Sequence, residues 1–188
     1  MERSVLMVGI GGQGIQLIGK TLALAATESG LNAMLAADYG GEMRGGTSQA
    51  TAVVGDGPIR ALPILPRTDS AIVMHDKFSG AVPERLDADG FLMLNSSIVD
   101  PPKAEGDHTL VSLPATDMAR EIDAPQAAGL LMLGAFCRLT GIADHDHLVA
   151  AMTSLLPPYR AQHAETNSRA LAAGAAAVSE RDLAAVSV

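Results

Sequence analysis

The chain has 188 residues, a formal net charge of −8 and a hydrophobic share of 48%. This length is enough for one hydrophobic core, and we expect residues 1–188 to form a single domain. The acidic balance, without a long run of Lys or Arg, argues against nucleic acid as a partner. Because no apolar stretch resembles a membrane span or a signal peptide, we expect a cytoplasmic protein that does not associate with membranes.

The cysteine and histidine content excludes several kinds of metal site. Cys137 is the one cysteine, so this chain cannot by itself hold an iron–sulfur cluster or a zinc ion bound by several cysteines. Its apolar surroundings predict a buried core thiol rather than a nucleophile. His145 and His147 are two positions apart at the start of a helical pattern, which predicts helix-cap residues rather than metal ligands.

The first predicted elements are a strand, a glycine turn and a helix. Residues 5–8 form a continuous apolar run, which is typical of a strand buried on both faces. From Gln13 the apolar residues recur at helical spacing until Ser29 and Gly30 end the pattern. Further short apolar runs predict strands at residues 33–36, 50–54, 70–74, 91–94 and 109–113.

Two features modify this alternating pattern. The pair Asp56-Gly57 lies between residues 50–54 and 59–62 and predicts an antiparallel hairpin at the edge of the sheet. From Thr116 onward the pattern is helical, and it includes residues 126–140, 144–155 and an Ala-rich stretch at 158–186. We therefore predict an α/β fold with a Rossmann-like, mostly parallel sheet, an edge hairpin and C-terminal helices.

The first candidate site is the segment 9–14, Gly-Ile-Gly-Gly-Gln-Gly, between the first strand and the first helix. Glycines there permit close approach of the backbone, and the N-terminus of the following helix favours an anion. Asp38 follows at roughly the 20-residue spacing at which dinucleotide-binding folds place an acid on the ribose. The alternative is that these glycines only let the strand and the helix pack closely.

The second candidate site is the glycine-rich segment 39–47, in which Arg44 is a candidate clamp for a phosphate or a carboxylate. In a parallel sheet ligands bind beyond the carboxyl ends of the strands, where both loops, His75 and Asn95 are expected to meet. A structural histidine and a turn cap are the alternatives for these last two residues. The predicted cofactor-binding residues are Gly11, Gly12, Gln13, Gly14, Tyr39, Arg44, Gly45, Gly46, Thr47 and Asn95.

The pair of segments 9–14 and 39–47 resembles the gamma subunit of 2-oxoacid:ferredoxin oxidoreductases. The similarity extends over nearly the whole chain, and it includes Asp69, Asn95-Ser96-Ser97, Leu133-Gly134-Ala135, Asn167, Ala170, Leu171 and Gly174. Two residues depart from the family's pattern. Gly41 replaces a proline that is usual after Tyr-Gly, and Gly129 stands where the family often has asparagine.

The resemblance implies a non-catalytic subunit of a complex that oxidatively decarboxylates a 2-oxoacid, transfers the acyl group to coenzyme A and reduces ferredoxin. It implies alpha and beta subunits as partners, with a delta subunit as a further candidate. Thiamine diphosphate and the iron–sulfur clusters are implied to lie in those partners. This subunit is implied to help bind coenzyme A at a subunit interface, and the style of the motifs favours 2-oxoglutarate over pyruvate.

Two other interpretations remain open at the level of sequence. A stand-alone NAD- or FAD-binding oxidoreductase is suggested by the glycine pattern with Asp38, although the sequence shows no hydride-transfer site. Alternatively, the glycine-rich loops only make contacts between subunits. No Ser/His/Asp set or close carboxylate pair points to an active site, so we expect no catalytic residue in this chain.

Overall fold

The computed structural model describes residues 2–39, 46–60, 62–101 and 108–186. The strands are β1 (Glu2–Ile10), β2 (Asn32–Tyr39), β3 (Thr47–Gly55), β4 (Thr68–Val73), β5 (Leu86–Asn95) and β6 (Thr109–Leu113). The α-helices are α1 (Ile15–Glu28), α2 (Ala115–Glu121), α3 (Ala128–Thr140), α4 (His145–Leu155), α5 (Ala164–Ala177) and α6 (Glu180–Val186). Three short 3₁₀ helices are η1 (Asp76–Phe78), η2 (Pro83–Arg85) and η3 (Pro158–His163). Within the described ranges, no helix is both long and apolar enough to span a bilayer.

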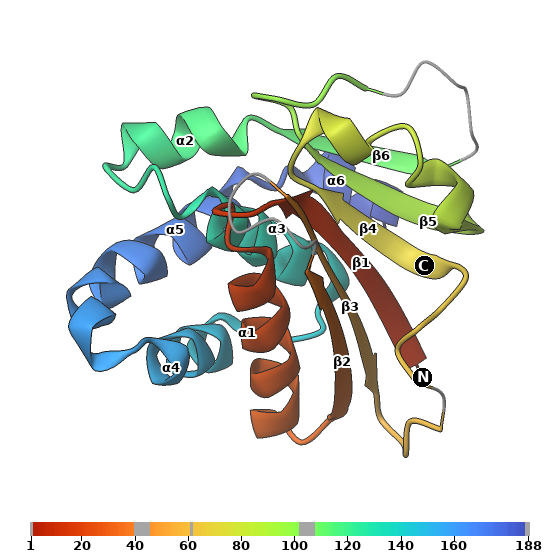
Figure 1. The fold of residues 1–188 in the computed structure, drawn as a ribbon, viewed down its shortest axis with the longest axis horizontal. Coiled ribbons are helices and arrows are strands. Elements are labelled where there is room, and N and C mark those ends of the chain that lie inside the picture. The colour runs from red at the N-terminus through yellow and green to blue at the C-terminus, as the bar shows by residue number, and fades with distance from the viewer. Residues whose placement is uncertain (1, 40–45, 61, 102–107, 187–188) are drawn as a thin grey trace.

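The strands form one sheet in the order β2-β3-β1-β4-β5-β6 (Figure 1). β1, β4, β5 and β6 pair in parallel, whereas β3 is antiparallel to both of its neighbours, β1 and β2. Since β1 and β2 are each antiparallel to β3, they run in the same direction as each other. The predicted α/β fold with a mostly parallel sheet and C-terminal helices is confirmed, and β3 is the one reversed strand of the described sheet.

The predicted hairpin at Asp56 and Gly57 is wrong. Residues 58–60 form no strand, and the chain continues to β4, which pairs with β1 on the side opposite β3. Pro58 follows the Asp-Gly pair directly, and a proline supplies no N–H for a strand ladder. The antiparallel pair at the edge of the sheet is β2 with β3, in register from Asn32 opposite Gly55.

The apolar strands are buried on both faces, as their continuous pattern predicts. Val5 and Met7 of β1 face the larger core, which the sheet shares with α1 and α3, and the next residues, Leu6 and Val8, face a smaller core. The loops around Val82 and Val99 cover that second face. The helices therefore gather on one face of the sheet, and Figure 1 shows α1 and α3 lying against it.

Two glycines bring the backbones of α3 and α5 into direct contact. A Cβ atom at Gly134 would overlap the carbonyl oxygen of Leu171, and one at Gly174 would overlap the carbonyl oxygen of Leu131. Only residues without a side chain permit this approach. The contact fixes α5 against α3, and it thereby fixes η3, which leads directly into α5.

We expect Gly134→Ala and Gly174→Ala each to lower the free energy of unfolding by about 1–3 kcal/mol or more, because each added methyl must push two helix backbones apart. Urea unfolding of the purified chain measures the loss. Gly80→Ala is the matched control, because a Cβ at Gly80 meets no atom within 4 Å. Equal stability of the Gly134 and Gly80 variants would contradict the close contact.

Candidate functional site

The two glycine-rich loops meet at the carboxyl edge of the sheet. The backbone N–H of Gly11 donates to the carbonyl oxygen of Gly46 over 2.9 Å. Thr47 begins β3 directly opposite Ile10, the last residue of β1. Arg44 and Gly45 lie outside the described residues, and for Tyr39 only the backbone is described. The structure thus brings Gly11, Gly46 and Thr47 together.

The first loop leads into α1 without a side-chain cap. Gly12 and Gly14 have φ angles of 104° and 77°, a left-handed region that glycine enters without the steric penalty of a Cβ. Gly14 is the N-cap of α1. Its carbonyl oxygen accepts from the N–H of Ile18 at 3.0 Å, a bond that closes the first turn of the helix. The N–H groups of that first turn have no acceptor within the helix, and they give its end a partial positive charge that favours an anion.

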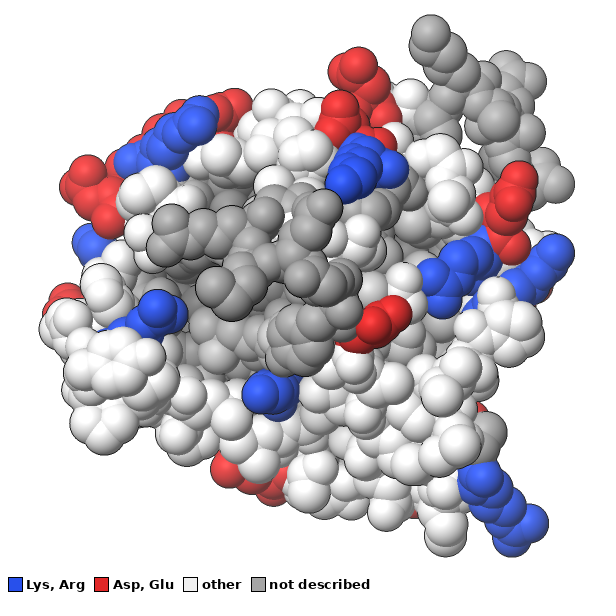
Figure 2. Space-filling model, viewed as in Figure 1, with Lys and Arg blue, Asp and Glu red and all other residues white. Residues whose placement is uncertain are grey.

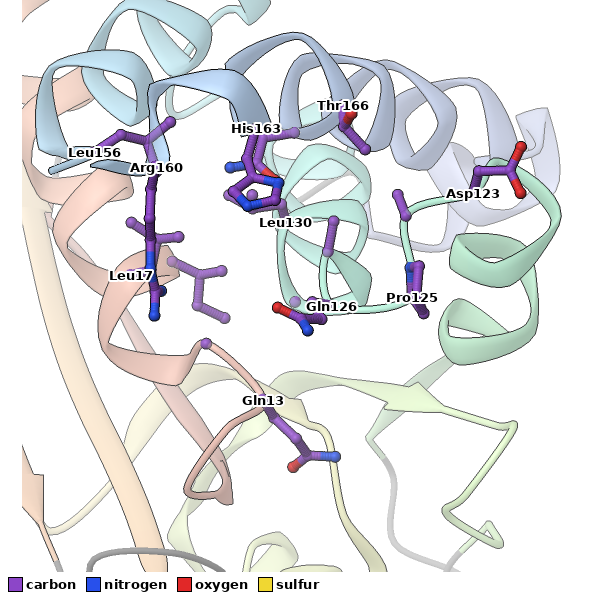
Figure 3. Close-up of a pocket in the computed structure, with 16 residues that line it drawn as sticks. Gln13, Leu17, Asp123, Pro125, Gln126, Leu130, Leu156, Arg160, His163 and Thr166 are labelled. Atoms are coloured by element: carbon purple, nitrogen blue, oxygen red, sulfur yellow. The ribbon is translucent and has the colours of Figure 1, made fainter. Parts of the chain in front are cut away.

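The side chain of Gln13 holds the first loop in place. Its Nε2 donates to the carbonyl oxygen of Met74 at 2.9 Å, and its Oε1 accepts from the N–H of Ile10 at 2.9 Å. These two bonds tie the end of β1 to the residue that follows β4. Figure 3 shows this side chain directed away from the neighbouring cavity. Direct contact of Gln13 with a ligand stays a prediction, whereas its role in closing the loop is observed.

We expect Gln13→Ala to lower the free energy of unfolding by about 1–3 kcal/mol, because two part-buried backbone groups lose their partners. Chemical denaturation followed by circular dichroism measures this change. Gln162→Ala, at an exposed position of η3, is the control and should stay within about 0.5 kcal/mol of the parent. A Gln13 variant as stable as this control would show that the two bonds contribute nothing.

Asn95 and His75 have structural partners at this edge. Asn95 is fully buried, donates to Thr116 Oγ1 at 2.8 Å and accepts from the N–H of Thr116 at 3.2 Å. These bonds link the end of β5 to the first turn of α2, so the turn-cap alternative accounts for its burial. His75 Nδ1 lies 2.7 Å from Asp76 Oδ1, and it also caps η1 by accepting from the N–H of Lys77.

A cavity of about 370 Å³ opens beside the N-terminus of α1 (Figure 3). Its walls come from α1, the loop between α2 and α3, η3 and the start of α5. Gly14 and Gln13 border it, which joins the cavity to the first glycine-rich loop. Polar side chains at its wall include Gln126, Arg160 and His163. Sequence reasoning missed these three residues, because no motif marks them and they reach the site only through the packing of the helices.

Gly129, one of the two departures from the family pattern, lies in the wall of this cavity, where α3 meets the first loop. A Cβ at this position would lie 2.7 Å from the carbonyl oxygen of Gln13 and 3.3 Å from Ile18 Cγ2. An asparagine therefore does not fit unless the first loop or α3 moves. Glycine lets the N-terminus of α3 rest directly on the glycine-rich loop. Gly41, the other departure, lies outside the described residues.

Among the described residues, the groups with shifted pKa values lie away from this cavity. Burial raises the pKa of Asp69, although the N–H of Ser4 donates to its carboxylate at 2.7 Å, and this residue stands near the amino end of β4. Burial raises the pKa of the Cys137 thiol to about 12, which agrees with the predicted core thiol. Asp144 caps α4 by accepting from the N–H of His147, as the helix-cap interpretation predicts.

The position of Asp38 argues against the dinucleotide fingerprint. In that fingerprint the acidic residue ends the strand adjacent to β1, whereas here β3 separates β2 from β1. Two strand spacings place the end of β2 about 10 Å from the end of β1. The side chain of Asp38 is exposed at the sheet edge. The feature that suggested a stand-alone NAD- or FAD-binding enzyme is therefore not arranged as such an enzyme requires.

Known proteins share both the sequence and the fold. Residues 4–177 match the family described as "Pyruvate ferredoxin/flavodoxin oxidoreductase". The chain is 31% identical over 160 residues to "2-oxoglutarate synthase subunit KorC" of Methanocaldococcus jannaschii, a match that spans 84% of this chain and 85% of the relative.

Two solved structures resemble this one closely. The gamma subunit of a keto/oxoacid ferredoxin oxidoreductase from Geobacter sulfurreducens has a TM-score of 0.79 and 25% identity, with 98% of each chain covered. A 2-oxoglutarate:ferredoxin oxidoreductase from Magnetococcus marinus, solved with 2-oxoglutarate, coenzyme A and succinyl-CoA bound, has a TM-score of 0.84. At 16% identity that second likeness concerns the fold alone. It covers 95% of this chain but 32% of the other, so this fold forms one part of a longer chain there.

The fold, the paired glycine-rich loops and these matches define an α/β subunit of the oxidoreductases that act on 2-oxoacids. The chain belongs to the pyruvate ferredoxin/flavodoxin oxidoreductase family, and within it to the gamma-subunit type. The resemblance that rests on segments 9–14 and 39–47 is thereby confirmed.

Proposed function

We propose that this chain helps bind coenzyme A at the interface between a gamma subunit and the catalytic subunits of a 2-oxoacid:ferredoxin oxidoreductase. The hydrogen bond from Gly11 to Gly46 carries this proposal, because it joins the second loop to the first, and the first loop leads into α1 and borders the cavity at Gln13 and Gly14. A glycine-rich loop that leads into a helix is a ready site for phosphate, and coenzyme A carries several phosphate groups. The Magnetococcus marinus enzyme with coenzyme A bound contains this fold as one part of a longer chain.

The proposed division of labour between the subunits rests on the family resemblance and agrees with what this chain contains. Membership of the family implies that the clusters and thiamine diphosphate are held by alpha and beta subunits, with a delta subunit as a further candidate partner, and the single cysteine of this chain agrees with that division. Thiamine diphosphate supplies the decarboxylation chemistry in those partners. This chain would position the coenzyme A thiol for transfer of the acyl group. We favour a complex that is cytoplasmic and that acts on 2-oxoglutarate. The similarity of this chain to a 2-oxoglutarate synthase subunit, KorC, supports that choice of substrate.

The subunit assignment predicts co-purification. The tagged chain, isolated from its host without oxygen, is expected to bring along chains that contain iron and thiamine diphosphate. Metal analysis, a thiamine assay and mass spectrometry of the co-purified chains measure this. Recovery of the chain alone with a bound dinucleotide would instead support the stand-alone oxidoreductase.

Within the complex, we expect Arg44→Ala to raise the KM for coenzyme A by about 10- to 100-fold, the effect of losing one charge-assisted hydrogen bond. Decarboxylation of the 2-oxoacid, followed without coenzyme A, should not change. Arg67→Ala is the matched control, because Arg67 is exposed and precedes β4 at the other edge of the sheet. An unchanged KM in the Arg44 variant would remove this arginine from the site.

A further inference from the structure

Three donor side chains face one hollow beside the glycine-rich loop. Arg160 and His163 reach it from η3, and Gln126 reaches it from the loop between α2 and α3 (Figure 3). We propose that this cavity binds a phosphate group of coenzyme A, with Arg160 as the charged ligand and with His163 and Gln126 as further donors. The inference rests on the proposed function and assigns residues that neither glycine-rich loop contains.

The size and lining of the cavity fit part of a ligand of this kind. Its volume of about 370 Å³ is near the lower end of the range for small-molecule sites, which is enough for a phosphorylated fragment. Leu17, Ile18 and Leu130 contribute apolar side chains to the lining of the cavity. A few convergent polar groups on an apolar lining are typical of sites that fix the orientation of a ligand.

Arg160 is available to an anion. Among the described residues its guanidinium has no carboxylate partner within ion-pair distance, and it stands 5.7 Å from the centre of the Tyr159 ring. Asp123 is the acidic residue at the cavity wall, and Figure 3 shows its carboxylate directed away from the hollow. A guanidinium presents a planar pair of N–H donors that matches two phosphate oxygens.

The electrostatic environment of the cavity differs from what the net charge of the whole chain suggests. The net charge is −8, and on the face shown in Figure 2 the described basic and acidic side chains are interspersed rather than gathered into a basic patch. At the cavity, however, α1 and α3 both begin, and neither Gly14 nor Ala127 offers a capping side chain. Both helix ends add partial positive charge to that of Arg160. An anion is therefore favoured at this place.

The backbone that carries Arg160 is held by the packing of the helices. η3 runs straight into α5, and α5 is held against α3 by the contacts at Gly134 and Gly174. α3 in turn rests on the first loop through Gly129. The distance between the backbone of η3 and the N-terminus of α1 therefore depends on backbone contacts, which reduces the ordering that a ligand would require.

The test compares two acyl acceptors in the assembled complex: coenzyme A, and pantetheine, which carries the same thiol without phosphate groups. We expect Arg160→Ala to raise the KM for coenzyme A by about 10- to 100-fold and to change the KM for pantetheine by less than 2-fold. Arg160→Gln, which keeps most of the side-chain length, should act in the same way. Arg169→Ala, at an exposed position of α5 outside the cavity, is the control and should leave both values unchanged.

Each other outcome overturns the inference. An equal rise in KM for both acceptors would mean that Arg160 acts through the fold rather than on a phosphate. An unchanged KM for coenzyme A would exclude Arg160 from the site. If the Arg160 variant has an unchanged KM for coenzyme A but the Arg44 variant has a raised one, the proposed function still stands and only the role of Arg160 is contradicted. If the KM for coenzyme A is unchanged in both variants, both proposals are contradicted.

Discussion

The antiparallel pairing of β1 with β3 determines where the candidate ligand groups lie. The two strands are in register from Glu2 opposite Gly55 to Ile10 opposite Thr47. Because β3 is reversed, the segment that enters it arrives at the edge where β1 ends. If β3 ran parallel to β1, its first residues would lie at the opposite edge, far from the glycine turn. One reversed strand in a mostly parallel sheet thus makes a two-loop site possible.

The helical layer contributes the other half of the site. Residues far apart in the chain, such as Gly14 and Arg160, line the same cavity because α5 packs on α3 and α3 packs on the first loop. Each of these contacts depends on a glycine. The glycines of this protein therefore act in two ways: those in the loops provide backbone conformations, and those in the helices provide close approach.

Local patterns predicted most of the strands and helices but not which strands lie next to each other. The run at residues 5–8 indicated a strand buried on both faces, and Gly30, with a φ of 88°, ends α1 where the pattern predicted. The order of the strands depends on long-range hydrogen bonding, and the Asp56-Gly57 pair misled because the residues after it, from Pro58 to Arg60, form no returning strand. Similarly, the partner of Gln13 is a carbonyl 61 positions away, which no local pattern shows. The cavity residues of η3 carry no motif, so they emerged only from the structure.

The state of Cys137 bears on how the assembled enzyme responds to air. It is the one cysteine of the chain, it is buried in α3, and its pKa is raised to about 12. At neutral pH the thiol is therefore protonated, and thiolates are the form that oxidants attack. Thiol oxidation therefore has no effective target on this subunit. Oxygen sensitivity of a complex that contains this subunit would not arise from a thiol of this chain.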